Sequence, residues 1–519
     1  MTSQVNEGAR PELVFGLVAP LGARLSDLGE ELARALQGFG YKTITVRLSD
    51  LLPRFSVWEE QPSKADEVRI AHLQSMGDAA RRENRDGAAL ARAAITEIRR
   101  ERQAITGSAD TPAPATAYIL YQLKHPDEVR LLRQTYGSAF LMVAGHAARE
   151  VRAAHLAKRM AAAADKPGQG DGYLGEANKL IWFDQKGGDD FGQNVRDTYP
   201  IADMFVDLNA AGGQFEVHRF VDLVFGHPFH TPSPDEYAMY HASTVALRSS
   251  DINRQVGAAI VNVTATPTGV VTNSDVLALG MNEVPRGGGG FYWDKASPDA
   301  RDQALEAQNE NRALDIKLSV LAELLKVIGA EKWLVKSVAT AEYSDLARKL
   351  LGALKGSQFM DIGEFSRPVH AEMAAIIDAA RRGVSIDGRS MYVTTFPCHN
   401  CAKHIVAAGL RKVVFLEPYP KSRAPNLYAE EIVLDASDGK TPEGKVVFVA
   451  FSGVGPRLYR VLFSMGERGN ANQHLTRNEW MQRKRGLSPL QVPPHLANAY
   501  LSAERVEVAV LQPSKFSAQ

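Results

Sequence analysis

The residues best suited to chemistry stand in two short motifs, His-Ala-Glu at 370–372 and Pro-Cys-His-Asn-Cys at 397–401. Both cysteines of the 519-residue chain, Cys398 and Cys401, fall in the second motif. Zinc prefers thiolate and imidazole ligands, and a catalytic zinc site keeps three protein ligands with one position open for water. His370, Cys398 and Cys401 therefore predict one catalytic zinc ion per chain.

The carboxylate of Glu372 stands two residues after His370, close to the expected metal but free to handle protons. Zinc lowers the pKa of its bound water, and a neighbouring carboxylate can then carry protons between that water and the substrate. The order H-x-E followed by P-C-x-x-C is the signature of zinc nucleobase deaminases. We therefore expect Glu372 to take a proton from the attacking water and to protonate the ring and the leaving amine.

Other interpretations of the two cysteines are a thioredoxin-like redox pair and half of a structural zinc site. A structural site needs four ligands, and the chain has no further cysteine. His404 could supply the fourth ligand, but His-Ala-Glu would then have no role. The catalytic zinc site accounts for both motifs.

The composition is that of an ordinary globular protein, with 45% hydrophobic and 23% charged residues. The 60 basic residues balance the 60 acidic ones, which argues against a wide surface for duplex nucleic acid or an anionic membrane. The first residues are polar, and no segment reaches the roughly 18 apolar residues of a membrane span. Two cysteines cannot form a disulfide framework, so we expect a cytoplasmic protein without a membrane partner.

Two α/β domains are predicted along the chain. The stretches ELVFGLVAPLG, SDLGEELARALQGFG and YKTITVRL form a strand, a helix and a strand, which is the βαβ pattern of a parallel sheet. Further apolar runs extend this unit to a three-layer α/β domain over residues 11–225. A proline-rich connector leads to a second domain over 230–465 with a helical insert at about 297–358, followed by a C-terminal extension over 466–519.

The second domain resembles the cytidine and deoxycytidylate deaminase family in the stretches ALRSSDINRQVGAAIV, LGMNEVPRGGGGFYW, HAE and PCHNC. The resemblance implies an α/β/α domain with zinc at two helix N-termini. It also implies that Asn282 binds the sugar hydroxyl and that Arg248 and Arg254 are candidates for the phosphate. Phe396 would stack on the pyrimidine. The alternatives are surface ion pairs for the arginines and a core position for Phe396.

The whole layout resembles the bacterial anti-phage dCTP deaminases, which join a nucleotide-kinase-like P-loop domain to a deoxycytidylate-type deaminase domain. The stretches GLVAPLGARLSDL, YQLKHPDEVRLLRQTYG and FGQNVRDTYPIADMFVDLN carry this likeness. In the first of them Ala23 stands where a P-loop has lysine, and Arg24 replaces Ser/Thr. We therefore expect no kinase activity. Either a nucleotide is bound by Gly16, Gly22 and Arg24, or the domain is a scaffold without a ligand.

These observations predict a zinc hydrolase that converts the free nucleotides dCTP and dCMP to uracil nucleotides and ammonia, depleting dCTP during phage infection. The resemblance also implies a homo-oligomer, and a small RNA or a nucleotide effector stays open as a regulator. One alternative is a deaminase of RNA or single-stranded DNA, which would need an electropositive channel. Another is a non-catalytic nucleotide sensor with a structural zinc, in which Glu372 would have no use.

Overall fold

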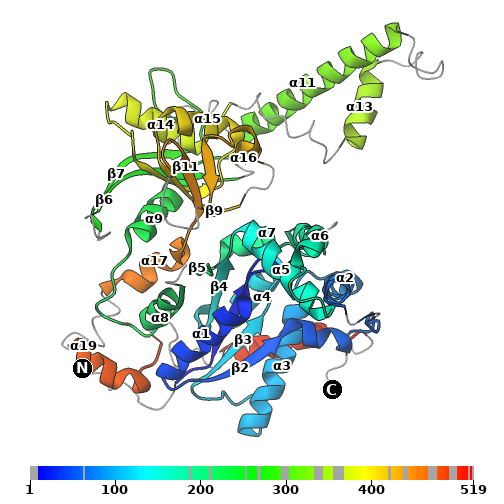
Figure 1. Ribbon diagram of the computed structural model, residues 1–519, viewed down its shortest axis with the longest axis vertical. Helices are drawn as coiled ribbons and strands as arrows, with labels where there is room; N and C mark the ends of the chain where they lie inside the picture. Colours follow the sequence, from blue (N-terminus) through cyan, green and yellow to red (C-terminus); the bar gives the residue numbers. More distant parts are fainter. Residues whose placement is uncertain are drawn as a thin grey trace. The chain divides into compact units, whose positions relative to one another are not determined.

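The computed structural model divides into two compact units, residues 1–240 with 411–519 and residues 241–410 (Figure 1). It describes residues 10–61, 63, 65–185, 190–209, 213–251, 254–265, 271–293, 303–331, 343–354, 367–418, 422–435, 442–465, 476–489, 499–511 and 515–516. The predicted domain bounds at 225, 230 and 465 stay a prediction beside this division.

A six-stranded sheet in the order β12-β5-β4-β1-β3-β2 lies at the centre of the first unit. Its strands are β1 (Leu13–Val18), β2 (Lys42–Arg47), β3 (Thr116–Tyr121), β4 (Phe140–His146), β5 (Met204–Asp207) and β12 (Gly453–Val454). The first five are parallel, and β12 is antiparallel to β5. All residues of β1 are buried, as expected for a strand covered on both faces. The predicted parallel sheet is confirmed, whereas its P-loop character stays a prediction.

Helices, among them the seven-residue 3-10 helix η1 (Leu48–Arg54), join these strands. The first unit contains η1 (Leu48–Arg54), α1 (Leu25–Gly38), α2 (Asp66–Asn84), α3 (Ala89–Thr106), α4 (Pro126–Tyr136), α5 (Arg149–Ala163), α6 (Leu174–Gln185), α7 (Val195–Thr198) and α8 (Gly213–Val224). The start of α4 is typical: Pro126 occupies the first turn, and His125 and Glu128 form a capping box.

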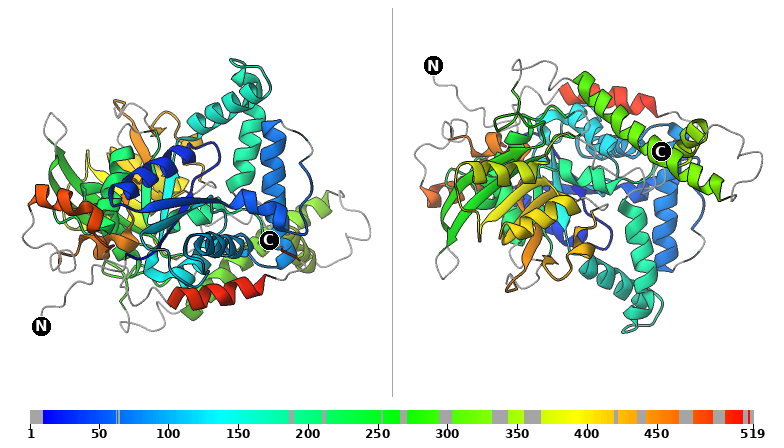
Figure 2. Two further views of the ribbon diagram at one scale, coloured as in Figure 1. Left: turned by 90° about the horizontal axis from the view of Figure 1, so that it is seen from below. Right: turned by 90° about the horizontal axis from the view of Figure 1, so that it is seen from above.

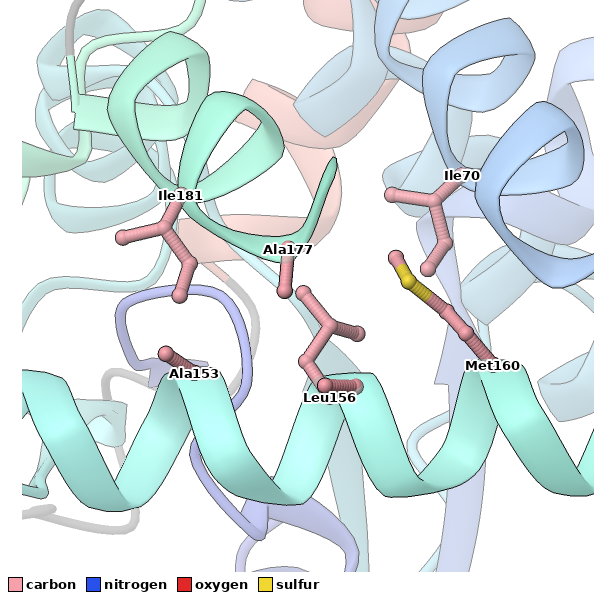
Figure 3. Close-up of a cluster of buried hydrophobic side chains, with 7 residues drawn as sticks. Ile70, Ala153, Leu156, Met160, Ala177 and Ile181 are labelled. Atoms are coloured by element: carbon pink, nitrogen blue, oxygen red, sulfur yellow. The ribbon is translucent and has the colours of Figure 1, made fainter. Parts of the chain in front are cut away.

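An apolar cluster fixes α2, α5 and α6 against one another (Figure 3). Its labelled members are Ile70, Ala153, Leu156, Met160, Ala177 and Ile181. In Figure 3 the side chains from α5 point towards those from the other two helices. Close packing of this kind leaves little room for the helices to shift.

The C-terminal part of the chain, residues 411–519, adds further strands and helices. It supplies the parallel strands β9 (Lys412–Glu417), β11 (Val446–Ala450) and β10 (Ile432–Leu434), and the helices α16 (Ala424–Leu427), α17 (Pro456–Phe463), α19 (Arg477–Arg483) and α20 (Ala499–Val510). Helix α20, coloured red in Figure 2, packs against α3 and α4. The C-terminal extension, for which no role was predicted, therefore carries helices that pack on the N-terminal domain.

The second unit contains the predicted zinc motifs. Strand β6 (Gly257–Ala265) pairs antiparallel with β7 (Val271–Met281) and with β8 (Ser390–Thr395). Helix α14 (Ala371–Arg381) packs on β6 and β7 and contacts α15 (His399–Ala407), and α9 (Pro234–Ala246) leads into the unit. Helices α11 (Gln303–Ala330) and α13 (Tyr343–Ala353) lie where the helical insert was predicted and share a small apolar core.

None of the helices in the described ranges is both long enough and apolar enough to cross a membrane. This agrees with the absence of a long apolar segment in the sequence.

Candidate metal centre

Two helix N-termini bring the predicted zinc ligands together. His370 is the N-cap of α14, and Cys398 is the N-cap of α15, with Cys401 in its first turn. The Nδ1 atom of His370 lies 3.4 Å from the Sγ atom of Cys398 and 3.4 Å from that of Cys401. The structure thus joins two motifs that are separated by 28 residues in the sequence.

The spacing of these three atoms fits a zinc ion. Bond lengths of about 2.0 Å to nitrogen and 2.3 Å to sulfur in a tetrahedral site place the N and S atoms roughly 3.5 Å apart. Cys401 is buried, Cys398 is half-buried and His370 is exposed, so one side of the group faces solvent. A site with three such ligands and an open side matches a catalytic zinc site better than a four-ligand structural one.

The local charges favour the ligand form of Cys398. The hydrogen bond from the Cys401 thiol, helped by that from His370, lowers the pKa of Cys398 to about 4. The hydrogen bond between His370 and Cys398 also raises the pKa of His370, to about 9. The pKa of Cys401 is raised, first by its hydrogen bond to Cys398 and then by burial. One thiolate is therefore already favoured by the protein side chains alone.

Glu372 lies in the first turn of α14 and is only 5% exposed. Burial raises the pKa of its carboxyl group to about 7, with a further contribution from the charge of Cys398. Its side chain also hydrogen-bonds Cys401, which places the carboxylate directly beside the ligand group. A carboxyl group with a pKa close to neutrality both accepts and donates protons readily, as a general acid–base must.

Two backbone contacts position α14, and neither was predicted from the sequence. Glu283 and Val369 form an isolated antiparallel bridge, in which each N–H donates to the other's carbonyl oxygen, directly before His370. In β7, Gly280 faces the first turn of α14, where a Cβ atom would lie 2.2 Å from the carbonyl oxygen of Ala371. The absence of a side chain at Gly280 thus allows the helix to lie close to the sheet.

Asn282 is almost fully buried, and its amide group bonds to the protein. Its Oδ1 accepts a hydrogen bond from the N–H of Val256, and its Nδ2 donates to Asp251 Oδ2 and to the carbonyl oxygen of Arg254. In this structure Asn282 therefore holds the segment around residue 254. Its predicted bond to a sugar hydroxyl stays a prediction.

The other predicted substrate residues differ in their surroundings. The guanidinium group of Arg248 donates to the carbonyl oxygens of Phe291 and Tyr292 and lies 3.7 Å from the centre of the Trp293 ring. Arg254 is exposed and stands three residues before β6 begins. Phe396 is buried directly after β8. Their roles in substrate binding stay predictions.

One further residue belongs to this region, although the sequence reasoning did not single it out. Asp251 accepts the hydrogen bond from Asn282, and its charge contributes to the raised pKa of His370. It stands in the stretch SSDINRQ, between the two predicted arginines. The sequence did offer a signal for Asp251, because it is an acidic residue between the two arginines that were candidates for the phosphate.

The three predicted nucleotide-binding residues lie in the first unit. Gly16 is inside β1, where a Cβ atom would lie 2.5 Å from the Leu123 side chain. Gly22 has φ +89° in the loop after β1, and Arg24 is the N-cap of α1. Of these three residues, Gly22 and Arg24 line the cavity at the N-terminus of α1, and Gly16 does not. Nucleotide binding by these three residues stays a prediction.

Comparison with known proteins finds relatives of the part of the chain that contains both motifs. Residues 232–417 match the family described as the cytidine and deoxycytidylate deaminase zinc-binding region. The deoxycytidylate deaminase of Enterobacteria phage T4 is 51% identical over 55 residues, which are 11% of this chain and 28% of the relative. The human deoxycytidylate deaminase is 26% identical over 181 residues, which are 35% of this chain and 63% of the relative.

Among solved structures, the dCMP deaminase of cyanophage S-TIM5 in apo form aligns with a TM-score of 0.21 and 17% identity. The alignment covers 42% of this chain and 99% of that chain. The chain spans from 28% to 63% of the length of the two curated relatives described above. The family match over residues 232–417 includes His370, Cys398 and Cys401.

Proposed function

We propose that the protein is a zinc hydrolase that deaminates free deoxycytidine nucleotides, dCMP or dCTP. The match of residues 232–417 to the cytidine and deoxycytidylate deaminase zinc-binding region supports this proposal. The observation that carries this proposal is the position of Glu372, buried beside the three donor atoms of His370, Cys398 and Cys401. Glu372 is not one of the three donors, so its carboxyl group stays available to carry protons, which a hydrolytic site needs and a structural site does not.

The residues of the site divide the chemistry between them. His370, Cys398 and Cys401 would hold the zinc ion, which when bound supplies a Lewis acid that lowers the pKa of water. Glu372 would accept a proton from the attacking water and deliver protons to the ring nitrogen and to the leaving amine. In the overall reaction a C4–O bond replaces the C4–N bond of cytosine, so water is consumed and ammonia is released.

A free nucleotide fits this chain better than a polynucleotide. The chain has 60 basic and 60 acidic residues, whereas binding of single-stranded nucleic acid relies on a positively charged groove and stacking platforms. Two or three arginine contacts are enough for one nucleotide phosphate, and Arg254 is exposed close to Asn282. If dCTP is a substrate, the reaction lowers the supply of dCTP for DNA synthesis, which is the phage-defence role that the resemblance implies.

A substrate survey tests the proposal. Zinc-loaded full-length protein is incubated with dCMP, dCTP, CMP, CTP and a cytosine-containing single-stranded DNA and RNA, and products are separated by liquid chromatography. We expect uracil nucleotides from dCMP or dCTP, and no product after the metal is removed with a chelator. Conversion of the oligonucleotides alone would favour a base-editing enzyme, and no conversion of any compound would favour a sensor.

A further inference from the structure

The first unit contains a cavity of about 440 Å³ that is separate from the zinc motifs. It is lined by the loop after β1, by η1 after β2, by the end of β3 and by residues of α2 and α5. Ligands of open α/β sheets bind beyond the carboxyl ends of the strands, and their cavities usually measure about 300–1,000 Å³. Position and size are therefore those of a small-molecule site.

The lining of this cavity is strongly basic. Among the described residues that line it, six are arginine or lysine and none is aspartate or glutamate. The six are Arg24, Arg47, Arg69, Arg81, Lys124 and Arg159. A cavity with one sign of charge concentrates ligands of the opposite sign, so this one suits an anion.

Four of the six cations already form ion pairs with acidic residues that do not line the cavity. Arg69 and Arg159 bond to Asp66, at 2.7 Å and 2.5 Å. Arg81 pairs with Glu128 at 2.7 Å, and Lys124 pairs with Asp184. These ion pairs hold the wall together, and the remaining two cations are the ones available to a ligand.

Those two cations are Arg47 and Arg24. Arg47 is exposed, lies 5.0 Å from the centre of the Tyr121 ring, and has no ion pair within the described part of the chain. Arg24 is 56% exposed and lies 3.8 Å from Asp27, at the outer limit of an ion pair. Arg24 is also the N-cap of the 14-residue helix α1, whose N-terminus favours anions.

Two buried amide side chains in the same cavity point to a second kind of contact. Gln193 is 3% exposed, and among the described residues neither its Oε1 nor its Nε2 has a hydrogen-bond partner. Gln74 is 7% exposed, and its Oε1 is likewise unpaired. Buried amide groups are normally hydrogen-bonded, so these atoms are set to pair with a ligand. The amide of Gln193 offers an N–H donor group and an acceptor oxygen, and Gln74 offers an acceptor oxygen, as the edge of a nucleobase requires.

We propose that this cavity binds a nucleoside 5′-monophosphate, with the phosphate at Arg24 and Arg47 and the base edge at Gln74 and Gln193. The packing of α2 against α5 in Figure 3 gives the site a fixed wall on the side of Ile70. The site is independent of the deaminase chemistry, since none of its residues belongs to the second unit. It also needs neither a P-loop lysine nor phosphoryl transfer.

Calorimetric titration of the full-length protein with AMP, GMP and dTMP, none of which is a cytosine nucleotide, tests the proposal. We expect at least one of them to bind, and its affinity to fall by about tenfold or more in Gln193→Leu and in Arg47→Ala. Gln37→Leu and Arg130→Ala, which replace exposed residues outside the cavity, should bind as the original protein does. The zinc motifs are unchanged in all four variants, so a loss in the first two assigns binding to this cavity.

Three results would overturn the proposal. The first is no binding of any of the three nucleotides. The second is an affinity in both Gln193→Leu and Arg47→Ala equal to that of the original protein. The third is an affinity for inorganic phosphate equal to that for the nucleotide. Gln193 is buried, so its replacement could unfold the unit. Arg47 is exposed, and its variant keeps the test decisive in that case. Thermal unfolding of each variant shows whether it is folded, and binding is compared only for folded variants.

Discussion

Gly280 in β7 lies so close to Ala371 in α14 that a Cβ atom on Gly280 would sit 2.2 Å from the Ala371 carbonyl oxygen. It would also lie 2.2 Å from the N–H nitrogen of Ala375. Because both neighbours are backbone atoms of one helix, a side chain here can be accommodated only if the helix moves. His370 and Glu372 stand at the start of that helix and would move with it.

Replacing Gly280 by alanine should therefore disturb the metal centre without touching a ligand. We expect a loss of about 1–3 kcal/mol in stability from overpacking, together with a lower zinc content per chain. Thermal unfolding and elemental analysis measure the two effects. Gly352→Ala is the matched control, since Gly352 lies in helix α13 with nothing within 4 Å of the added atom. Equal zinc content and stability in the two variants would contradict this account.

Arg254→Ala tests the phosphate contact. The side chain of Arg254 is exposed, and Arg248 donates to the carbonyl oxygens of Phe291 and Tyr292. We expect Arg254→Ala to raise the KM for dCMP by about tenfold with an unchanged zinc content, because one charge-assisted contact is lost. The KM for deoxycytidine, which has no phosphate, should stay the same.

Arg248→Ala is the contrasting variant. If Arg248 acts through the loop rather than through the phosphate, its loss should impair the nucleotide and the nucleoside alike and lower the melting temperature. Steady-state kinetics with both compounds separates the two roles. An unchanged KM for dCMP in Arg254→Ala would remove this residue from the phosphate site.

Glu504 in α20 tests the role of the C-terminal extension. Arg102 is fully buried and lies 2.6 Å from Glu504 and 2.9 Å from Glu12, and Tyr136 donates a further hydrogen bond to Glu504. Glu504→Ala leaves a buried arginine with one partner fewer, which should cost about 3–5 kcal/mol. Urea unfolding followed by fluorescence measures the change. Val506→Ala on the exposed side of the same helix should have little effect, and an equal shift in both variants would show that α20 does not depend on this network.

The grouping of His370, Cys398 and Cys401 could be predicted from the sequence because both motifs are short and their geometry is local. A helix N-terminus places Cys398 and Cys401 one turn apart wherever the helix lies. The contacts that position the first motif could not be predicted, since Gly280 and Glu283 meet α14 only through tertiary packing. A glycine in a strand signals a close approach, but not which element approaches.

The first unit shows the same contrast. The strand–helix–strand pattern correctly indicated a parallel sheet, but β1 and β2 are not neighbours, because β3 lies between them. Nothing in the local pattern encodes that order. The C-terminal extension was too polar for its helices to be predicted, and the structure shows why: Glu504 is a polar residue that is buried through its pairing with Arg102.

The most direct test of the central claim separates metal binding from turnover in one substitution. Glu372→Gln removes the proton carrier and leaves the imidazole and both thiols in place. We predict that this variant keeps one zinc ion per chain and its melting temperature, while its rate of ammonia release from dCMP and dCTP falls by about 10²-fold or more. A Glu372→Gln protein that binds zinc and deaminates these nucleotides at the original rate would contradict the account.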